Sequence, residues 1–183
     1  CRIAEGKVVL DIASGEGYGS AMLAAHASKV IGVDISPEAV EHAKNRYRRD
    51  NLEFRVGSCS EIPLTNASVD LVVSFETLEH HDQHDRMMEE VKRVLRPRGV
   101  LLVSCPDKLH YTIEPSRLNP FHVRELFKHE FEDLLSRYFK KTAYFAQRVL
   151  YGSGIFSSQT SAPLNSYLLS KETIKEFPGL SDP

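Results

Sequence analysis

Residues 8–19 read VVLDIASGEGYG, an almost entirely apolar run that leads directly into closely spaced glycines. Strands that are buried on both faces read as continuous apolar runs. Glycines permit a tight turn, and the Ala-rich segment 20–27 that follows favours a helix. The stretch therefore predicts a strand, a glycine-rich turn and a helix, which together open a doubly wound α/β fold.

The alternation of strand and helix signals continues along the chain. Further strands are expected at 30–33, 52–56, 69–75 and 100–104, with a break at 96–99, and helices from Pro37, along 87–95 and along 127–138. Segments 141–149 and 165–170 predict a last strand pair, expected as a hairpin. We therefore expect one Rossmann-like doubly wound α/β domain over residues 1–183, with a mostly parallel seven-stranded sheet and an antiparallel last strand.

Composition narrows the class of protein. The 183 residues are 42% hydrophobic and 26% charged, as in an ordinary globular domain, and the net charge of −2 argues against a nucleic-acid binder. No apolar run is long enough to cross a membrane, no signal peptide is evident, and three cysteines without paired spacing fit a reducing compartment. We expect a cytoplasmic protein without membrane insertion. Because the chain opens on Cys1 rather than Met, we also expect a missing N-terminal segment. Oligomeric state is not indicated.

The glycine-rich turn suits a ligand other than a dinucleotide. The dinucleotide fingerprint requires a third glycine where this chain has Ser20, and Asp11 and Glu16 would repel a pyrophosphate at the helix N-terminus. Asp11 instead suits a ligand ammonium, and Asp34, which ends the second strand, can accept both hydroxyls of a ribose. A ligand with a ribose, an amine and no pyrophosphate points to S-adenosyl-L-methionine. The alternatives are that the glycines only allow close packing and that Asp34 is only a helix-end charge.

Four ordered motifs resemble the class I S-adenosylmethionine-dependent methyltransferases. Residues 9–19 resemble their motif I, VDIS at 33–36 their acidic ribose loop, 63–72 the approach to strand four, and 95–101 the turn into strand five. The resemblance covers residues 7 to about 105 and implies S-adenosyl-L-methionine as cofactor and methyl transfer as activity. The cofactor-binding residues that it implies are Asp11, Ala13, Gly15, Gly17, Asp34, Ile35, Ser58, Cys59 and Phe75.

Two positions depart from the family pattern. Ala13 stands where the family usually has a glycine, which is tolerable if its φ is negative. Ser58 and Cys59 stand where the family often has an aspartate that holds the adenine amine. The Ser58 hydroxyl or backbone groups at Cys59 are then expected to hold it.

The segment FETLEHH, residues 75–81, follows strand four at the rim where the transferred methyl group would lie. A hydroxyl acceptor must lose its proton, and histidine is suited to accept it. We expect His80 as the catalytic base, with His81 as second choice. The alternative is that both histidines cap the following helix or contact the methionine part of the cofactor.

A metal-assisted reading of the same segment stays open. Glu76, Glu79 and His80 resemble the acid, acid, histidine cluster of the ubiquinone-pathway O-methyltransferases, which is associated with a divalent ion. Such a cluster could hold Mg²⁺ and polarise an acceptor oxygen. Positioning of the cofactor without a metal is our interpretation, so no metal ligand is expected.

The acceptor is expected to be a small molecule. Residues 74–77, SFET, lack the motif of DNA amino-methyltransferases, and Cys105-Pro106 reverses the order of the cytosine C5 nucleophile motif. Residues 119–126, NPFHVREL, resemble a stretch of methyltransferases encoded among bacterial polysaccharide genes. We therefore expect Glu79, His122 and Arg124 to bind the acceptor, a hydroxyl of a sugar or similar metabolite. The alternatives are a cofactor-binding domain without transferase activity and a nicotinamide dehydrogenase.

Overall fold

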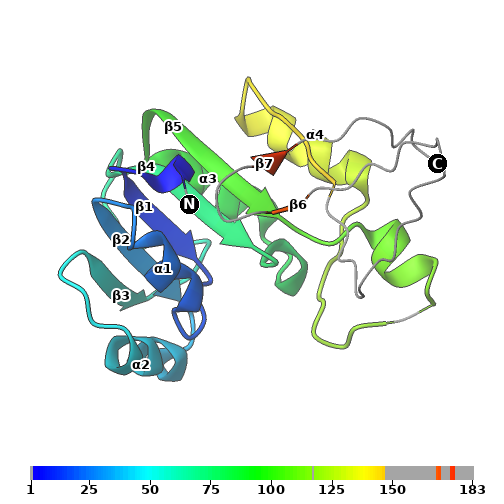
Figure 1. Ribbon diagram of the computed structural model, residues 1–183. Coiled ribbons are helices and arrows are strands. Elements are labelled where there is room, and N and C mark those ends of the chain that lie inside the picture. Colours follow the sequence, from blue (N-terminus) through cyan, green and yellow to red (C-terminus); the bar gives the residue numbers. More distant parts are fainter. Residues whose placement is uncertain (1, 117, 147–167, 170–173, 176–183) are drawn as a thin grey trace, which may run out of the picture. The chain divides into compact units, whose positions relative to one another are not determined.

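The computed structural model describes residues 2–116, 118–146, 168–169 and 174–175 (Figure 1). The chain divides into two units, Cys1–Ala143 and Tyr144–Pro183. The described strands of the first unit are β1 Val8–Ile12, β2 Lys29–Asp34, β3 Leu52–Val56, β4 Val69–Phe75 and β5 Leu95–Ser104. Its α-helices are α1 Tyr18–Leu23, α2 Pro37–Arg46, α3 His84–Val94 and α4 Lys128–Tyr138, with short helical turns η1 Arg2–Ala4, η2 Leu78–His80 and η3 Leu109–Ile113. The predicted α/β class is confirmed.

The five strands of the first unit form one sheet in the order β3-β2-β1-β4-β5, and every pair is parallel. The order reverses between β1 and β4. In open α/β sheets, ligands bind at such a reversal, outside the carboxyl ends of the strands. Asp11 of β1, Asp34 of β2 and Phe75 of β4 all lie at this carboxyl edge.

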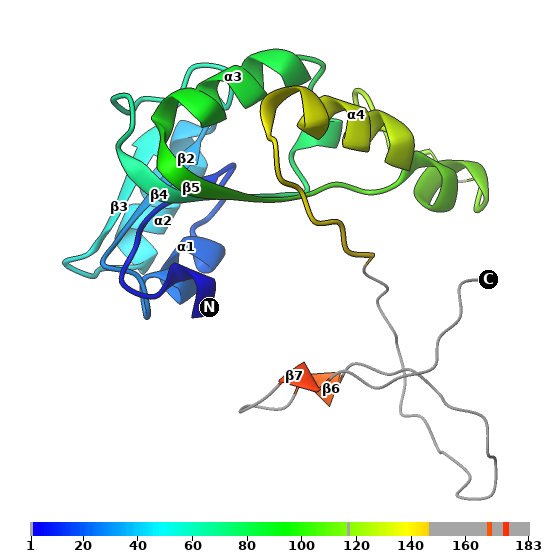
Figure 2. The ribbon, with the colours of Figure 1, turned by 90° about the horizontal axis from the view of Figure 1, so that it is seen from above.

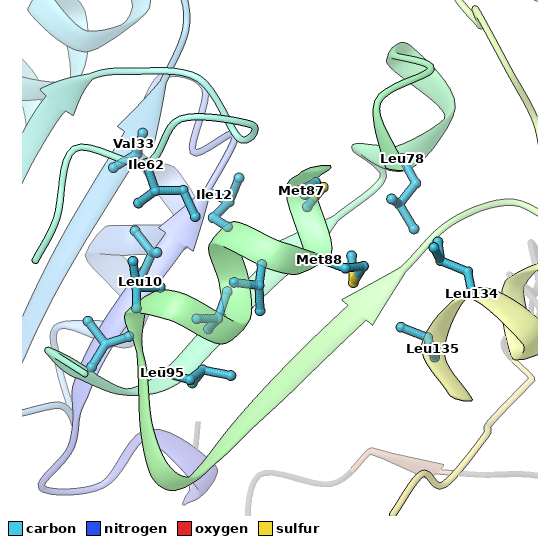
Figure 3. Close-up of a cluster of buried hydrophobic side chains, with 14 of the residues drawn as sticks. Leu10, Ile12, Val33, Ile62, Leu78, Met87, Met88, Leu95, Leu134 and Leu135 are labelled. Atoms are coloured by element: carbon cyan, nitrogen blue, oxygen red, sulfur yellow. The ribbon is translucent and has the colours of Figure 1, made fainter. Parts of the chain in front are cut away.

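Side chains that alternate along the strands build a hydrophobic core on each face of the sheet. Leu10 and Ile12 of β1 belong to a cluster with Met87 and Met88 of α3 and with α4 residues (Figure 3). Val9 belongs instead to a cluster on the other face, with Ala24 and Ala27 directly after α1. Figure 2 shows α3 and α1 on opposite sides of the strands. This is the double winding predicted from the sequence.

Some predicted boundaries are wrong. The first helix spans Tyr18–Leu23 rather than 20–27. Segment 96–99, expected as a break between the helix and a strand that begins at Val100, is an irregularity inside β5. Val69 of β4 pairs with Leu95, but Leu71, only two residues later, pairs with Val100, so β5 has extra residues between these two pairs. The left-handed φ of 69° at Arg98 belongs to this extra loop of chain. Helix α3 still ends before it, at Val94.

The predicted last strand pair is mostly outside the described residues. Residues 141–146 are described and are not a strand, so that part of the prediction for 141–149 is wrong. In the second unit, β6 Leu168–Leu169 pairs antiparallel with β7 Ile174–Lys175. The sixth and seventh strands of the main sheet, and one domain over 1–183, stay predictions.

An ion pair between a buried carboxylate, Glu90, and a partly exposed guanidinium, Arg93, connects the segment after β3 to α3. Glu90 is 6% exposed, accepts the backbone N–H of Ile62 at 2.8 Å and pairs with Arg93 Nη2 at 2.7 Å. The guanidinium also donates to the carbonyls of Ile62 and Leu64, at 2.9 and 2.7 Å. Hydrogen bonding to Arg93 holds the pKa of Glu90 below its usual range. The pair therefore fixes the chain just beyond the expected adenine-contacting residues.

Candidate active site

The glycine-rich turn after β1 requires glycine at position 17 for two reasons. Gly17 has a left-handed φ of 87°, and a Cβ there would lie 2.6 Å from Phe54 Cζ and 2.8 Å from Ala43 Cβ. Gly15 also has a left-handed φ, of 52°, but its surroundings are open. Gly17 thus allows packing of the turn against α2 and β3, whereas Gly15 leaves space beside the backbone for a ligand.

Ala13 departs from its expected conformation. An alanine at this position was expected to be tolerable if its φ is negative, but the φ of Ala13 is 56°. For residues other than glycine this left-handed region costs about 1–2 kcal/mol. Glu76, which follows β4, has a similar φ of 52°. Residues with a strained backbone therefore directly follow β1 and β4, the two strands at the reversal of strand order. Backbone strain of this kind is common at functional sites.

Asp11 is a buried carboxylate at the carboxyl end of β1. Its Oδ2 accepts a hydrogen bond of 2.6 Å from the Ser20 hydroxyl, and the residue is 8% exposed. Burial raises the pKa of Asp11 to about 6; the Ser20 hydrogen bond opposes this shift and the Asp34 charge adds to it. Asp11 is therefore mainly ionised at pH 7.5 and suited to a cationic group. Ser20, a mismatch to the dinucleotide fingerprint, has the role of holding Asp11.

Asp34 connects the glycine-rich turn to the start of α2. Its Oδ2 accepts the Gly15 N–H at 2.7 Å, and its Oδ1 accepts the Ser36 N–H at 2.9 Å. Each carboxylate oxygen can accept a second hydrogen bond. The structural and the ribose-binding interpretations of Asp34 are thus compatible. The next residue, Ile35, is 74% exposed beside it.

Ser58 and Cys59 follow β3 beside Asp34, since the Gly57 N–H donates to the Asp34 carbonyl at 2.9 Å. The Ser58 hydroxyl lies 2.9 Å from the Ser60 hydroxyl and accepts the Ser60 N–H at 3.2 Å. Cys59 is half-buried against the core, and burial raises the pKa of its thiol. The Ser58 hydroxyl is engaged within its own turn, so the adenine contact stays a prediction.

The two glutamates after β4 have different surroundings. Glu76 Oε1 accepts the Ser104 hydroxyl at 2.6 Å, at the end of β5. Glu79 is 2% exposed, and its Oε2 has no hydrogen-bond partner among the described residues. Burial raises the pKa of Glu79, and the Glu76 charge adds to this shift. Phe75, which ends β4, is 53% exposed.

His80 and His122 lie side by side, as the acceptor prediction requires. Their ring centroids are 5.2 Å apart, edge to face. His80 Nδ1 is 3.0 Å from the carbonyl oxygen of Phe121. Because a carbonyl only accepts, Nδ1 carries the proton, and Nε2 has a lone pair with which it can act as a base. The carbonyl of Glu79 accepts the N–H groups of Val123 and Arg124, at 2.7 and 3.1 Å.

These contacts place segment 119–125 against the η2 turn, but the predicted acceptor residues differ in exposure. The His122 side chain is 7% exposed, whereas Arg124 is an exposed residue. Glu125, which sequence reasoning missed, pairs with His122 Nδ1 at 2.6 Å. The spacing of three residues between them was the available signal.

The possible metal ligands differ from the set considered in the sequence. Among the described residues, the group with one ligand atom each within 4.8 Å is Glu79, His80 and His122, without Glu76. Both ring nitrogens of His122 are in hydrogen bonds, with Glu125 and Asn119. The Glu79 carboxylate and the His80 Nε2 then remain as free ligand groups among the three residues. The donor set fits hydrogen bonding better than a metal ion.

His81 lies apart from this group, at the start of α3. Its Nδ1 accepts the Gln83 N–H at 3.1 Å, and its ring contacts His84 edge to face. Burial lowers the pKa of His81, and the neighbouring His84 adds to this shift. His84 itself is buried, with Nε2 2.8 Å from the Leu78 carbonyl. His81 thus bonds within the turn before α3, although α3 has no side-chain cap hydrogen bond, and the roles of His81 as cap or base both stay predictions.

Comparison with known proteins decides the family. Residues 10–103, a little over half of the chain, match the family model described as a methyltransferase domain. The chain belongs to this family. The predicted resemblance to class I S-adenosylmethionine-dependent methyltransferases is confirmed, and with it the methyltransferase class and the S-adenosyl-L-methionine cofactor at the level of the family.

Individual relatives agree with this assignment. A "Probable S-adenosylmethionine-dependent methyltransferase" of Mycolicibacterium smegmatis is 44% identical over 133 residues, covering 71% of this chain and 50% of that protein. A phthiotriol/phenolphthiotriol dimycocerosates methyltransferase of Mycobacterium leprae is 34% identical, covering 52% and 36%. A solved structure from Pyrococcus horikoshii OT3 is 29% identical with a TM-score of 0.66, covering 76% of each chain. The chain spans half the length or less of these curated relatives.

Proposed function

We propose that this protein transfers a methyl group from S-adenosyl-L-methionine to a hydroxyl of a small molecule. The observation that carries this proposal is the composition of the carboxyl edge. Asp11 and Asp34 end the strands on one side of the reversal, whereas His80 follows β4 on the other side and contacts His122, which follows β5. A cofactor site and an acceptor site on adjacent strands would allow direct transfer, to which proximity contributes most of the acceleration.

On the cofactor side, we assign the amine of the methionine part to Asp11 and the ribose hydroxyls to the free lone pairs of Asp34. The left-handed turn at Gly15 leaves open space at its Cα for close approach. The exposed side chains of Ile35 and Phe75, 74% and 53% accessible, offer apolar surface to the cofactor.

On the acceptor side, His80 Nε2 takes the proton of the acceptor hydroxyl while the hydroxyl oxygen forms a bond to the methyl carbon. Bound S-adenosyl-L-methionine supplies a sulfonium, so the departing thioether needs no protonation by the protein. Imidazoles and the Glu79 carboxyl suit a polar hydroxylated acceptor such as a sugar. Arg124 would bind an acceptor that carries a carboxylate or phosphate, since a guanidinium binds either with two hydrogen bonds.

An acceptor panel tests the proposal against its rivals. The chain is incubated with methyl-labelled S-adenosylmethionine and sugars, phenols, alcohols and amines, and label in the product is measured. Transfer to hydroxyl acceptors supports the proposal. Binding of the cofactor without transfer to any member favours a binding domain without activity, and labelled amines would make nitrogen the acceptor atom.

The proposed partner is a small molecule in the cytoplasm, without nucleic acid. In the part of the chain that the structure describes, none of the helices combines the length and apolarity that crossing a bilayer demands. A small-molecule partner is consistent with the name of the Mycobacterium leprae relative, a phthiotriol/phenolphthiotriol dimycocerosates methyltransferase.

Replacing Asp34 with asparagine should weaken S-adenosylmethionine binding by about 1.5–3 kcal/mol, the usual contribution of hydrogen bonds to a charged group. Asparagine keeps an acceptor for one of the two backbone N–H groups, of Gly15 or Ser36, but loses the charge and the acceptor for the other. Calorimetry measures the affinity, and thermal unfolding checks the fold. Glu41→Gln, an exposed carboxylate on α2 bonded to Asn45, is the control. Unchanged affinity in Asp34→Asn would reduce Asp34 to a structural residue.

Removal of divalent ions should leave the transfer intact. Both ring nitrogens of His122 are in hydrogen bonds, which leaves one carboxylate, that of Glu79, and one imidazole nitrogen, whereas Mg²⁺ sites use several oxygen ligands. Turnover and cofactor binding are measured before and after treatment with EDTA. Strict Mg²⁺ dependence that disappears in Glu79→Gln would establish the metal-assisted mechanism instead.

A further inference from the structure

The strongest unexplained feature of the acceptor side is a buried carboxylate, Glu125. Its Oε1 accepts two hydrogen bonds, from His122 Nδ1 at 2.6 Å and from the Thr112 hydroxyl at 2.7 Å. The side chains of Glu125 and His122 are each 7% exposed. Although burial raises it, hydrogen bonds from Thr112 and His122 hold the pKa of Glu125 below its usual range. The pair is therefore a buried carboxylate–imidazole unit.

A second histidine–glutamate pair nearby shows the contrast. His110 Nδ1 lies 2.7 Å from Glu114 Oε2, but these side chains are 59% and 56% exposed. Exposed ion pairs contribute little because water screens them. The two pairs have similar distances and differ in burial, which makes Glu114 a matched control for Glu125.

Glu125 fixes both the position and the proton of His122. The Nδ1 of His122 donates to the carboxylate, so Nε2 is left to accept a hydrogen bond from Asn119 Nδ2 at 3.0 Å. The ring also stacks on Tyr111, with centroids 5.1 Å apart. Both ring nitrogens and one face of the imidazole thus contact neighbouring side chains, and these contacts fix the orientation of the ring.

His122 in turn holds the carbonyl that orients His80. Phe121 immediately precedes His122, and its carbonyl accepts the proton of His80 Nδ1 at 3.0 Å. The His122 ring also contacts the His80 ring edge to face. If His122 shifts, the Phe121 carbonyl shifts with it. His80 is then free to carry its proton on Nε2, the form that cannot accept a proton from a hydroxyl at that nitrogen.

We propose that Glu125 is a positioning residue for methyl transfer, which acts through His122 and the Phe121 carbonyl to keep the proton of His80 on Nδ1. This rests on the proposed function, in which His80 Nε2 is the base. Glu125 touches neither the cofactor nor the reacting atoms. Its contribution is the orientation of the base, and small misplacements of a catalytic group can cost about 100-fold in rate.

The test combines histidine ring NMR with kinetics on the chain and three variants. In the wild-type chain with ¹⁵N-labelled histidine, we expect His80 to be protonated at Nδ1 and not at Nε2. Glu125→Ala should shift His80 to a mixture of both forms and lower kcat about 10–100-fold, with the Kd for S-adenosylmethionine within twofold. Glu125→Gln should restore both, because its amide oxygen can accept from His122 and Thr112. Glu114→Ala should change neither.

Each outcome bears on the proposal. A wild-type His80 with its proton on Nε2 overturns it, and so does Glu125→Ala with an unchanged His80 form and unchanged kcat. If Glu125→Ala does not fold, Thr112→Val removes one donor to the same carboxylate and should shift His80 in the same direction, less strongly; no shift there overturns the proposal. If the folded chain binds the cofactor but methylates no acceptor, the proposed function fails, and the NMR result still decides whether Glu125 orients His80.

Discussion

Replacing His80 with alanine is expected to lower turnover by about 10²–10⁴-fold, the usual contribution of a general base. The affinity for S-adenosylmethionine should stay within twofold, because His80 follows β4 and its side chain contacts Phe121 and His122 rather than Asp11 or Asp34. Initial rates with a hydroxyl acceptor and calorimetry with the cofactor measure the two quantities separately.

The adjacent histidine provides the control. His81 is bonded to the Gln83 N–H at the start of α3, so His81→Ala should lower stability slightly and leave kcat within a few fold. Equal losses of turnover in His80→Ala and His81→Ala would indicate that segment 75–81 has only a structural role. Full activity in His80→Ala with a large loss in His81→Ala would identify His81 as the base, the second choice of the sequence analysis.

Replacing Arg93 with methionine is expected to lower the free energy of unfolding by about 3 kcal/mol, because removing the partner of the buried Glu90 carboxylate leaves its charge uncompensated. Glu90, 6% exposed, would lose the guanidinium that it contacts at 2.7 Å. The Leu64 carbonyl would lose the guanidinium as a donor, and the Ile62 carbonyl would keep the Leu64 N–H as its donor. Urea unfolding followed by circular dichroism gives the change.

The same helix contains a matched pair at the surface. Arg86 and Glu89 are also three residues apart but are 59% and 54% exposed, and Arg86→Met should cost less than about 1 kcal/mol. A loss below 1 kcal/mol in Arg93→Met, equal to that of Arg86→Met, would show that the buried pair does not hold the segment after β3. The double variant Glu90→Gln, Arg93→Met should recover part of the loss.

Much of the sheet and of the cofactor side could be predicted because their signals are local. A continuous apolar run such as 8–12 is diagnostic of a strand buried on both faces. The glycines at 15 and 17 and the acid that ends the second strand recur at fixed spacings, so Asp11 and Asp34 could be placed at the carboxyl edge before the structure was known. His80 and His122 could be expected to lie close together because the segments that contain them lie at the carboxyl edge of the same sheet.

The failures share a dependence on contacts between distant segments. The left-handed φ of Ala13 and the extra residues within β5 depend on how strands pair, which no short pattern encodes. Ser20 looked only like a mismatch, because its hydrogen bond to Asp11 joins a helix to a strand. Neighbours in the sequence also have different surroundings: His80 contacts segment 119–122, whereas His81 bonds to the Gln83 N–H just before α3.

Calorimetric titration of the chain with S-adenosylmethionine and, separately, with NADH tests the cofactor assignment. For S-adenosylmethionine we expect a Kd in the micromolar range, about −8 kcal/mol. For NADH we expect no measurable binding, because the Asp11 charge would repel a pyrophosphate and Ser20 occupies the position of the third glycine of the dinucleotide fingerprint. Binding of NADH by a folded chain that does not bind S-adenosylmethionine would contradict the cofactor assignment.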